Sequence, residues 1–409
     1  MPLNYFQFLT DNHVIKRIDT HVHAPQYPNV GIFGKSTLLD WLNKYTFPME
    51  ASMSSLPKAR RVYTRCVRRM LANGTTTAAY FATRDVDATN LLADLCHTMG
   101  QRAFIGRVCM DHMAPDYYID ESPEKAIADT RATIEHIRSL DSDFELVSPI
   151  LTPRFAPSCT GEMMKRLAEL HRETQLPLQT HIDENKGEIE LVKRLFPDSK
   201  SYADVYDTCG LLTDKMILAH AIHLTEEEAD LVAERKAKVA HCPCSNSALT
   251  SGVARVRWLL EKGIQVGLGT DMSGGYSPSI LEAARQAKLV SNHLVVPGGQ
   301  LEAATEEERA KAVLSVDEVL YLATRGGAQV VGLADKIGAF EVGMQWDAQL
   351  ISLGTVPEEV ALDDSGADGN VDLFGWETWE ERIAKWVFNG DDRNTKKVWV
   401  QGRLVHERT

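Results

Sequence analysis

The chain has 409 residues, of which 44% are hydrophobic, so it can bury a large core and is too long for one small module. Its formal net charge of −13 argues against nucleic acid as the main partner, because phosphate binding needs concentrated lysine and arginine. No apolar run reaches the ~18 residues that cross a bilayer, and no basic start leads into an apolar signal segment. Seven cysteines without framework spacing fit a reducing compartment, so we expect free thiols, no membrane partner and a cytoplasmic location.

The first predicted strand, residues 17–23, carries His21 and His23. Alternate side chains of a strand point to the same face, so both imidazoles can reach one metal ion. The pair is a weak signal by itself, because two histidines can also share a strand without binding metal. Whether the pair binds a metal ion depends on which further ligands the later strands contribute.

Eight short apolar or β-branched runs predict strands, and helical patterns such as residues 161–174 and 225–237 separate them. The runs cover residues 17–23, 75–83, 102–110, 147–155, 177–185, 216–224, 238–246 and 264–272. This alternation predicts parallel βαβ units, and eight of them over about 250 residues predict a closed (β/α)8 TIM barrel. An open doubly wound sheet is the main alternative, but the chain lacks the G-x-G-x-x-G fingerprint that would support it.

Segments outside the eight strands complete the expected organisation. The basic stretch at residues 58–70 carries apolar residues at helical spacing and predicts a solvated helix face, and residues 301–313 predict a charged helix or insertion. Near the C-terminus, residues 338–353 and 396–405 alternate as strands do and flank an acidic stretch. We therefore expect three parts: a short N-terminal segment at 1–17, the barrel at 18–335 and a β appendage with an acidic connection at 336–409.

Polar residues cluster at the C-terminal ends of the predicted strands. In a barrel these ends meet at one mouth, where the active site is built. Three nitrogen or oxygen ligands plus water are typical of catalytic Zn²⁺, whereas closed structural sites are usually rich in cysteine. The H-x-E and P-C-x-x-C pair of cytidine-type deaminases is missing from the chain. The strand-end residues are His21, His23, Arg154, His181, Glu184, His220, His241 and Asp271.

Several stretches resemble the amidohydrolase superfamily. They are "IDTHVHAPQY", "PILTPRF", "THIDEN", "LAHAIHL", "HCPCSN" and "GLGTDMSGG". Gln26 after the H-x-H pair, and Arg154 and Phe155 within "TPRF", are similar to the members that deaminate guanine. The resemblance implies a metal-dependent hydrolase barrel that converts guanine to xanthine and ammonia in purine catabolism, and it implies a homodimer.

The resemblance also implies one zinc ion per subunit, bound by His21, His23, His181 and Asp271. His220 would lie beside the metal. The fourth strand ends in Arg154 and offers no lysine to bridge a second metal, so we expect a mononuclear site. The roles of His220 and His241 stay open, and a structural role for His241 is an alternative.

The expected chemistry follows from the ligand set. Zinc lowers the pKa of bound water to ~7 and so supplies hydroxide at neutral pH. Glu184, three residues after His181, is placed to take that proton and return it to a ring nitrogen and to the departing ammonia. The expected catalytic residues are Glu184, Asp271 and His220.

Specificity for guanine requires polar groups that match the purine edge. By resemblance, Gln26 and Arg154 hydrogen-bond guanine, with Arg154 at the 6-oxo group, and Phe155 packs on the ring. Adenine should then be a poor substrate, because buried donors would stay unpaired. The implied substrate contacts are His23, Ala24, Pro25, Gln26, Arg154, Phe155, His181, Glu184 and Asp271.

The chain departs from the resemblance at its start, because only about twenty residues precede the H-x-H pair, whereas family members carry several strands there. We therefore expect a β-sandwich appendage that is shortened at its N-terminal side and a less stable protein. Two alternative functions remain: an amidohydrolase for another aminated or halogenated heterocycle, and a noncatalytic family member. His13 and His223 are expected to be structural.

Overall fold

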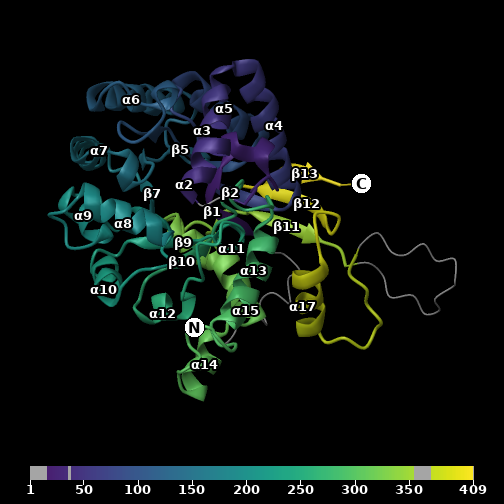
Figure 1. Ribbon diagram of the computed structural model, residues 1–409. Helices are drawn as coiled ribbons and strands as arrows, with labels where there is room; N and C mark the ends of the chain where they lie inside the picture. Colours follow the sequence, from purple (N-terminus) through teal and green to yellow (C-terminus); the bar gives the residue numbers. More distant parts are fainter. Residues whose placement is uncertain (1–15, 36–37, 354–369, 409) are drawn as a thin grey trace.

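The computed structural model describes residues 16–35, 38–353 and 370–408 and contains eight parallel strands surrounded by helices (Figure 1). The strands form two four-stranded sheets, in the orders β1-β2-β3-β5 and β10-β9-β8-β7. All eight predicted strands are confirmed. Their bounds are β1 Arg17–His23, β2 Thr75–Phe81, β3 Arg102–Gly106, β5 Val147–Pro149, β7 Leu178–Ile182, β8 Met216–His220, β9 Lys238–His241 and β10 Val266–Leu268.

Backbone hydrogen bonds join the two sheets into a ring. On one side, Leu151 forms a parallel bridge with Leu178, and its carbonyl oxygen accepts from Gln179 N at 2.9 Å. On the other side, Asp271 N donates to His21 O at 2.9 Å and His23 N donates to Met272 O at 3.1 Å. The predicted closed barrel is therefore confirmed. A short parallel pair, β4 Val108–Cys109 and β6 Thr152–Pro153, extends β3 and β5 at the C-terminal mouth.

The barrel interior is apolar at the end away from the mouth. One buried cluster fills this end of the barrel. It joins inward side chains of five strands and Ile150, just after β5, to residues of α16 (Gly327–Val330) and of the turn that follows it. These inward residues are Ile18, Ala79, Phe104, Ile150, Ile217 and Ala240. Polar strand-end residues are thereby confined to the opposite, C-terminal end.

Helices form the outer layer and carry the expected start signals. The side chain of Thr160 caps α7 by accepting from Met163 N at 3.1 Å, and Thr225 and Glu228 form a capping box on α10. Helix α4 exposes its arginines and buries the opposite face, as predicted for residues 58–70. The helices are α2 Leu38–Trp41, α3 Phe47–Ala51, α4 Leu56–Ala72, α5 Val86–Met99, α6 Pro123–Leu140, α7 Gly161–Thr174, α8 Lys186–Leu195, α9 Tyr202–Thr208, α10 Glu226–Glu234, α11 Pro243–Ala248, α12 Val256–Glu261, α13 Ile280–His293, α14 Glu306–Ala312, α15 Val316–Tyr321, α16 Gly327–Val330 and α17 Trp379–Asn389.

Short 3-10 and π-helical turns link these elements. The 3-10 turns are η1 Ala24–Asn29, η3 Ser52–Ser54, η4 Asp116–Tyr118 and η5 Ala156–Ser158, and the π-helical turns are η2 Leu42–Thr46 and η6 Leu322–Gly326. None of the helices in the described ranges is both long enough and apolar enough to span a bilayer.

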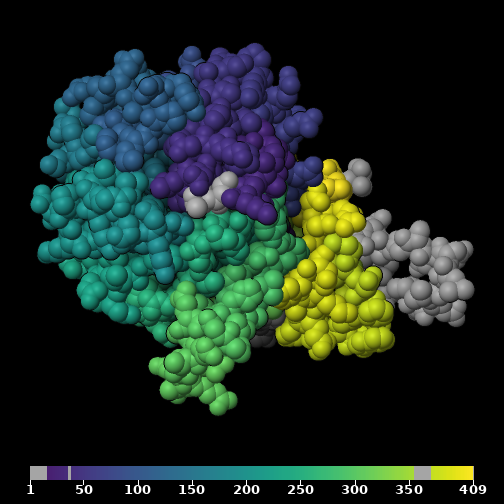
Figure 2. Space-filling view, viewed as in Figure 1, coloured from purple at the N-terminus to yellow at the C-terminus, as the bar shows by residue number. Residues whose placement is uncertain are grey.

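The C-terminal segment forms the predicted β appendage beside the barrel, where it is yellow in Figure 2. Strands β11 Ala348–Ile351, β12 Thr395–Val400 and β13 Arg403–Glu407 pair antiparallel in that order, so the appendage is one three-stranded sheet over the described residues. Helix α17 lies within the stretch predicted as an acidic connection, and its Trp386 packs against Leu281 of α13 in a buried cluster. The N-terminal part, residues 1–15, and His13 lie outside the described residues, and the division into three parts stays a prediction.

A buried ion pair joins the barrel to the appendage. Asp347 accepts from both terminal nitrogens of Arg102 and from Gln401 N at 2.9 Å, and both charged side chains are almost fully buried. Removing one partner of such a pair leaves an uncompensated buried charge.

We expect Asp347→Asn to lower the free energy of unfolding by about 3 kcal/mol, because the Arg102 charge loses its counter-ion inside the protein. Urea denaturation followed by circular dichroism measures the loss. A change below about 0.5 kcal/mol, the size of an ordinary surface substitution, would show that this pair does not hold the two parts together.

Candidate active site and metal centre

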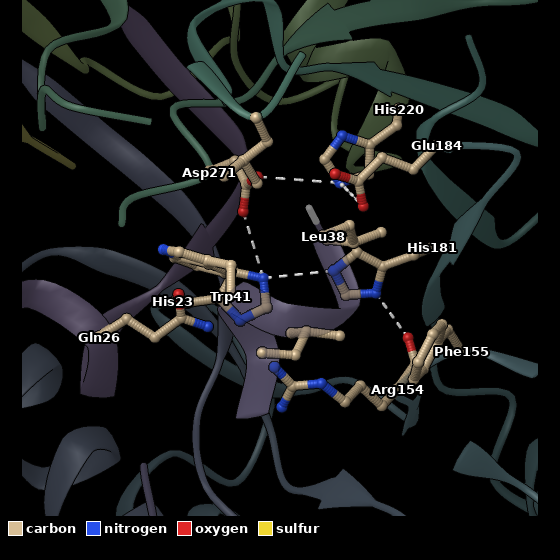
Figure 3. A pocket seen from close by; sticks show the side chains of 12 residues that line it. His23, Gln26, Leu38, Trp41, Arg154, Phe155, His181, Glu184, His220 and Asp271 are labelled. Atoms are coloured by element: carbon tan, nitrogen blue, oxygen red, sulfur yellow. Dashed lines mark hydrogen bonds and ion pairs between the residues drawn. The ribbon is translucent and has the colours of Figure 1, made fainter. Parts of the chain in front are cut away.

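Four side chains converge at the mouth of the barrel. His21 and His23 lie on β1, His181 lies on β7, and Asp271 follows β10. Figure 3 shows His23, His181 and Asp271. The Nε2 atoms of His21 and His23 are 3.2 Å apart, and those of His23 and His181 are 3.3 Å apart. Asp271 Oδ1 lies 3.2 Å from His21 Nε2 and 3.3 Å from His23 Nε2.

These distances fit a divalent metal ion. Four ligands at zinc–nitrogen and zinc–oxygen bond lengths of about 2.0–2.1 Å around a tetrahedral centre lie about 3.3 Å from each other. The donors are imidazole nitrogens and one carboxylate oxygen, with no thiolate among them, which is typical of a catalytic site. His21, His23 and Asp271 lie close together and His181 lies beside His23, so these four residues could hold a metal.

Two groups outside the quartet fix its geometry. His181 Nδ1 donates to Arg154 O at 2.5 Å, which leaves the lone pair of Nε2 for a metal. Asp19, a residue that sequence reasoning missed, accepts from Thr270 N at 3.0 Å and Thr270 Oγ1 at 2.5 Å. Asp271, the next residue, has φ +45°, a left-handed conformation that is unfavourable for aspartate. The Asp19 contacts therefore hold the turn that aims Asp271 at the histidines.

Electrostatics in the quartet follow from burial. Burial lowers the pKa of His21 to about 4, so this imidazole is neutral and able to bind a cation at neutral pH. Burial alone would raise the pKa of Asp271, but hydrogen bonding with His21 and His23 holds it well below its usual range. A neutral imidazole and an ionised carboxylate are the protonation states that metal binding requires of these two residues.

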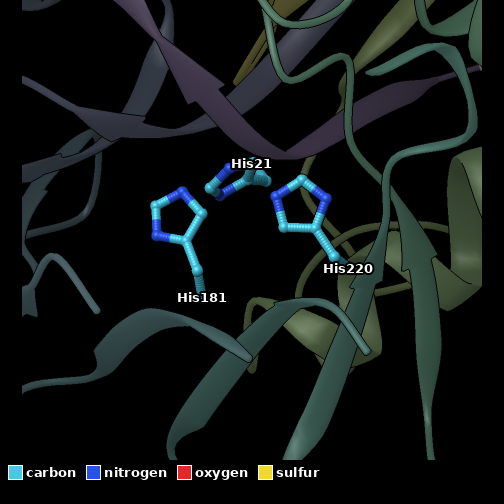
Figure 4. A group of neighbouring side chains, drawn as sticks. All are labelled: His21, His181 and His220. Carbon is cyan, nitrogen blue, oxygen red and sulfur yellow. The ribbon is translucent and has the colours of Figure 1, made fainter. Parts of the chain in front are cut away.

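His220 and Glu184 lie directly beside the quartet. His220 Nε2 is 3.4 Å from Glu184 Oε2 and 3.8 Å from Asp271 Oδ2, and its ring stacks on His181 at 5.5 Å between centroids. Figure 4 shows His220 grouped with His21 and His181. Asn246, which was not predicted as a site residue, accepts from His220 Nδ1 at 2.9 Å and so orients the ring.

The two carboxylates near His220 shift the protonation equilibria in the site. Burial opposes a charged imidazole, but the carboxylates of Glu184 and Asp271 raise the pKa of His220. Burial raises the pKa of Glu184 to about 7, partly offset by the nearby His220. Glu184 can therefore exchange a proton near neutral pH, as a general acid and base must.

The wall facing Glu184 carries the predicted purine contacts Gln26, Arg154 and Phe155. All three side chains are buried and line the same pocket as His23, His181 and Asp271. Gln26 and Arg154 both bind Glu50, a carboxylate that the sequence did not reveal as a site residue.

Three apolar side chains from α2 and η2, Leu38, Trp41 and Leu42, cover the pocket together with Leu249. The pocket is partly open to the outside, and the empty volume between its lining side chains and the opening is about 390 Å³.

The remaining predicted residues lie outside the pocket lining. Ala24 and Pro25 are buried in η1 and position Gln26. His241 is fully buried, burial lowers its pKa to about 3, and its ring nitrogens have no hydrogen-bond partner among the described residues. His223 Nε2 bonds Ser251 O at 2.8 Å, which agrees with the structural role expected for it.

The family model described as the amidohydrolase family matches residues 15–405. The chain belongs to the amidohydrolase family.

Its relatives within that family are guanine deaminases. A protein named as a probable guanine deaminase from Schizosaccharomyces pombe is 50% identical, over 95% of this chain and 70% of the relative. The guanine deaminase of Homo sapiens is 42% identical, over 95% of this chain and 81% of the relative. A crystal structure of guanine deaminase from C. acetobutylicum with bound guanine in the active site has 34% identity and a TM-score of 0.84, covering 96% of this chain and 87% of that chain.

Proposed function

We propose that this protein hydrolyses guanine to xanthine and ammonia and acts in purine catabolism. The observation that carries the proposal is one pocket lined by three members of the quartet, by the buried Glu184 and by the Gln26 and Arg154 pair. The names of its relatives support the same substrate. A cytoplasmic location, suggested by the free thiols, and a homodimer belong to the proposal.

The metal we propose is Zn²⁺, one per subunit, held by His21, His23, His181 and Asp271. A zinc ion bound there would lower the pKa of a water molecule so that it loses its proton near neutral pH. The 3.2–3.3 Å distances from His23 to the other three donors, and from His21 to Asp271, support this assignment.

The residues around the quartet supply the proton transfers. Glu184 takes the proton from water and delivers it to a ring nitrogen next to C2, while the water oxygen forms the new bond to C2. Glu184 then takes the second proton, from the new C2 hydroxyl, and passes it to the amino group, so that the C2–N bond breaks, ammonia leaves and C2 keeps its oxygen as a carbonyl group. His220, 3.4 Å from Glu184 Oε2, is placed to hold the attacking water by hydrogen bonding, and Asp271 Oδ2 faces the same space.

Substrate recognition falls to the wall opposite. Arg154 would donate to the 6-oxo group, Gln26 would bond the neighbouring ring edge, and Phe155 would pack on the ring face. Adenine lacks the oxo group, so it would leave buried donors without partners, a mismatch that can cost a factor of ~10⁴.

One assay tests the proposal. Zinc-loaded protein is offered guanine, adenine, cytosine and a triazine, and released ammonia is measured. Ammonia from guanine alone is the expected result. Turnover of only another ring would overturn the substrate, and a folded, metal-bound protein without any turnover would favour a noncatalytic family member.

We expect kcat/KM for guanine to fall about tenfold per pH unit below pH 7. Glu184 must be ionised to accept the proton from water, and burial raises its pKa to about 7, so acid protonates it and removes the base. Bound metal is quantified at each pH, because protonation of the histidines also releases metal. A flat profile between pH 5.5 and 7 with metal retained would contradict this assignment.

A further inference from the structure

Glu50 is the centre of a buried hydrogen-bond network behind the pocket wall. It lies in α3, is fully buried, and does not line the pocket itself. Its Oε2 accepts from Arg154 Nη1 at 2.6 Å and from Tyr118 Oη at 2.9 Å. Its Oε1 accepts from Gln26 Nε2 at 2.7 Å and from Arg154 Nη2 at 3.1 Å. One carboxylate therefore binds both polar residues that face the substrate.

The carboxylate decides which way the Gln26 amide points. An ionised carboxylate only accepts hydrogen bonds, so Gln26 must turn its NH₂ group toward Glu50 and its carbonyl oxygen away. The guanidinium of Arg154, hydrogen-bonded to Glu50 and close to it, keeps the pKa of Glu50 below its usual value despite burial. Among the residues that the structure describes, Gln26 Oε1 has only long contacts with Ser273, at 3.4 and 3.5 Å, so it can accept a further hydrogen bond.

The same carboxylate orients Arg154. Both terminal nitrogens of the guanidinium face Glu50, and the ring of Phe47 lies 5.1 Å from the guanidinium carbon. Each terminal nitrogen carries two hydrogens, and the pair with Glu50 uses one of each. The guanidinium therefore keeps further donors while its position and charge are fixed.

We propose that Glu50 is the positioning residue that sets purine specificity, because it fixes Gln26 as an acceptor and Arg154 as a donor toward the substrate edge. This inference rests on the proposed function. Guanine presents N1–H as a donor beside its 6-oxo acceptor, which matches this pattern. 2-Aminopurine carries the same leaving amino group at C2, but its N1 is an acceptor and it lacks the oxo group, so it mismatches both positions.

The test compares guanine with 2-aminopurine in the Glu50→Gln variant, using kcat and KM for each. The substituted amide would present an NH₂ group as well as a carbonyl oxygen, so the amide of Gln26 loses its fixed orientation and Arg154 loses its charged partner. We expect kcat/KM for guanine to fall about 100-fold, mainly through KM, while 2-aminopurine changes less than about fivefold. The preference for guanine would therefore shrink by more than tenfold.

Two further variants make the result specific. Asp347→Asn removes another buried carboxylate paired with arginine, far from the pocket, and should leave the preference unchanged although it destabilises the fold. Glu50→Asp keeps the charge but draws the carboxylate back by one methylene, and should show an intermediate loss of preference. It replaces Glu50→Gln as the test if that variant does not fold.

Metal content separates recognition from metal binding, because Glu50 Oε1 is also 3.9 Å from His23 Nδ1. Full metal occupancy with a reduced guanine preference supports the proposal. An equal loss for both bases, or an unchanged preference, overturns the role of Glu50 but leaves the proposed function intact. A wild-type protein that does not turn over guanine overturns both.

Discussion

Replacing Glu184 with glutamine is expected to lower kcat for guanine by about 10⁴-fold while the metal stays bound. The amide cannot accept the proton from water or return it to the leaving amino group. Glu184 is buried beside His220 and Asp271 and is not one of the four proposed ligands, so the metal quartet keeps all its donors. Steady-state ammonia release and metal analysis of the same sample measure the two effects.

The matched variant is Glu184→Asp, which keeps a carboxylate but shortens the side chain. It should retain more activity than Glu184→Gln, because a proton acceptor is still present at a longer distance. If Glu184→Gln kept activity within about tenfold of the wild type, less than general acid–base catalysis normally contributes, another group would have to carry the proton.

Removing the metal with a chelator should abolish turnover and lower the melting temperature. In the quartet, the donor atom of His23 lies 3.2–3.3 Å from those of His21, His181 and Asp271, and all four side chains are buried, a desolvated arrangement that a bound cation would stabilise. At a free metal concentration 1,000 times the Kd, binding adds about 4 kcal/mol to the free energy of unfolding. Calorimetry with and without metal gives the shift.

Adding back Zn²⁺ to the metal-free protein should restore both properties together. An Asp271→Asn variant provides the comparison, because it removes the carboxylate charge from the quartet and should weaken binding and activity in parallel. Full activity with less than about 0.1 metal ion per chain would contradict a metal-dependent reaction of the kind described here.

The barrel was predictable because its strands are short, apolar and separated by helical patterns. Residues 17–23 are a strand at the predicted bounds. Several predicted runs extend past the end of the strand, and for two of them the reason is clear. Pro243 begins α11 directly after β9, since proline favours the first turn of a helix. After β10, the chain leaves the sheet and Asp271 adopts its left-handed conformation.

The features that were not predicted differ in how clearly the sequence signals them. Helix α17 has a signal in the sequence, since Thr378 and Glu381 form a capping box, but the surrounding acidic residues suggested a connection. Glu50 and Asn246 had no such local signal. Glu50 meets Arg154 across 104 residues of chain, and Asn246 meets His220 across 26. Such pairings depend on the folded barrel and could not be read from spacing.

The seam between β1 and β10 gives the site a further property. Thr20 Oγ1 donates to Leu268 O, 248 residues away, and the quartet spans this same seam with His21 and His23 on one side and Asp271 on the other. A bound cation would thus link β1, the first strand of the barrel, to the segment that follows β10, the last strand. A nascent chain that has not yet reached Asp271 holds three of the four ligands and cannot form this link. It can therefore become active only after the barrel has closed.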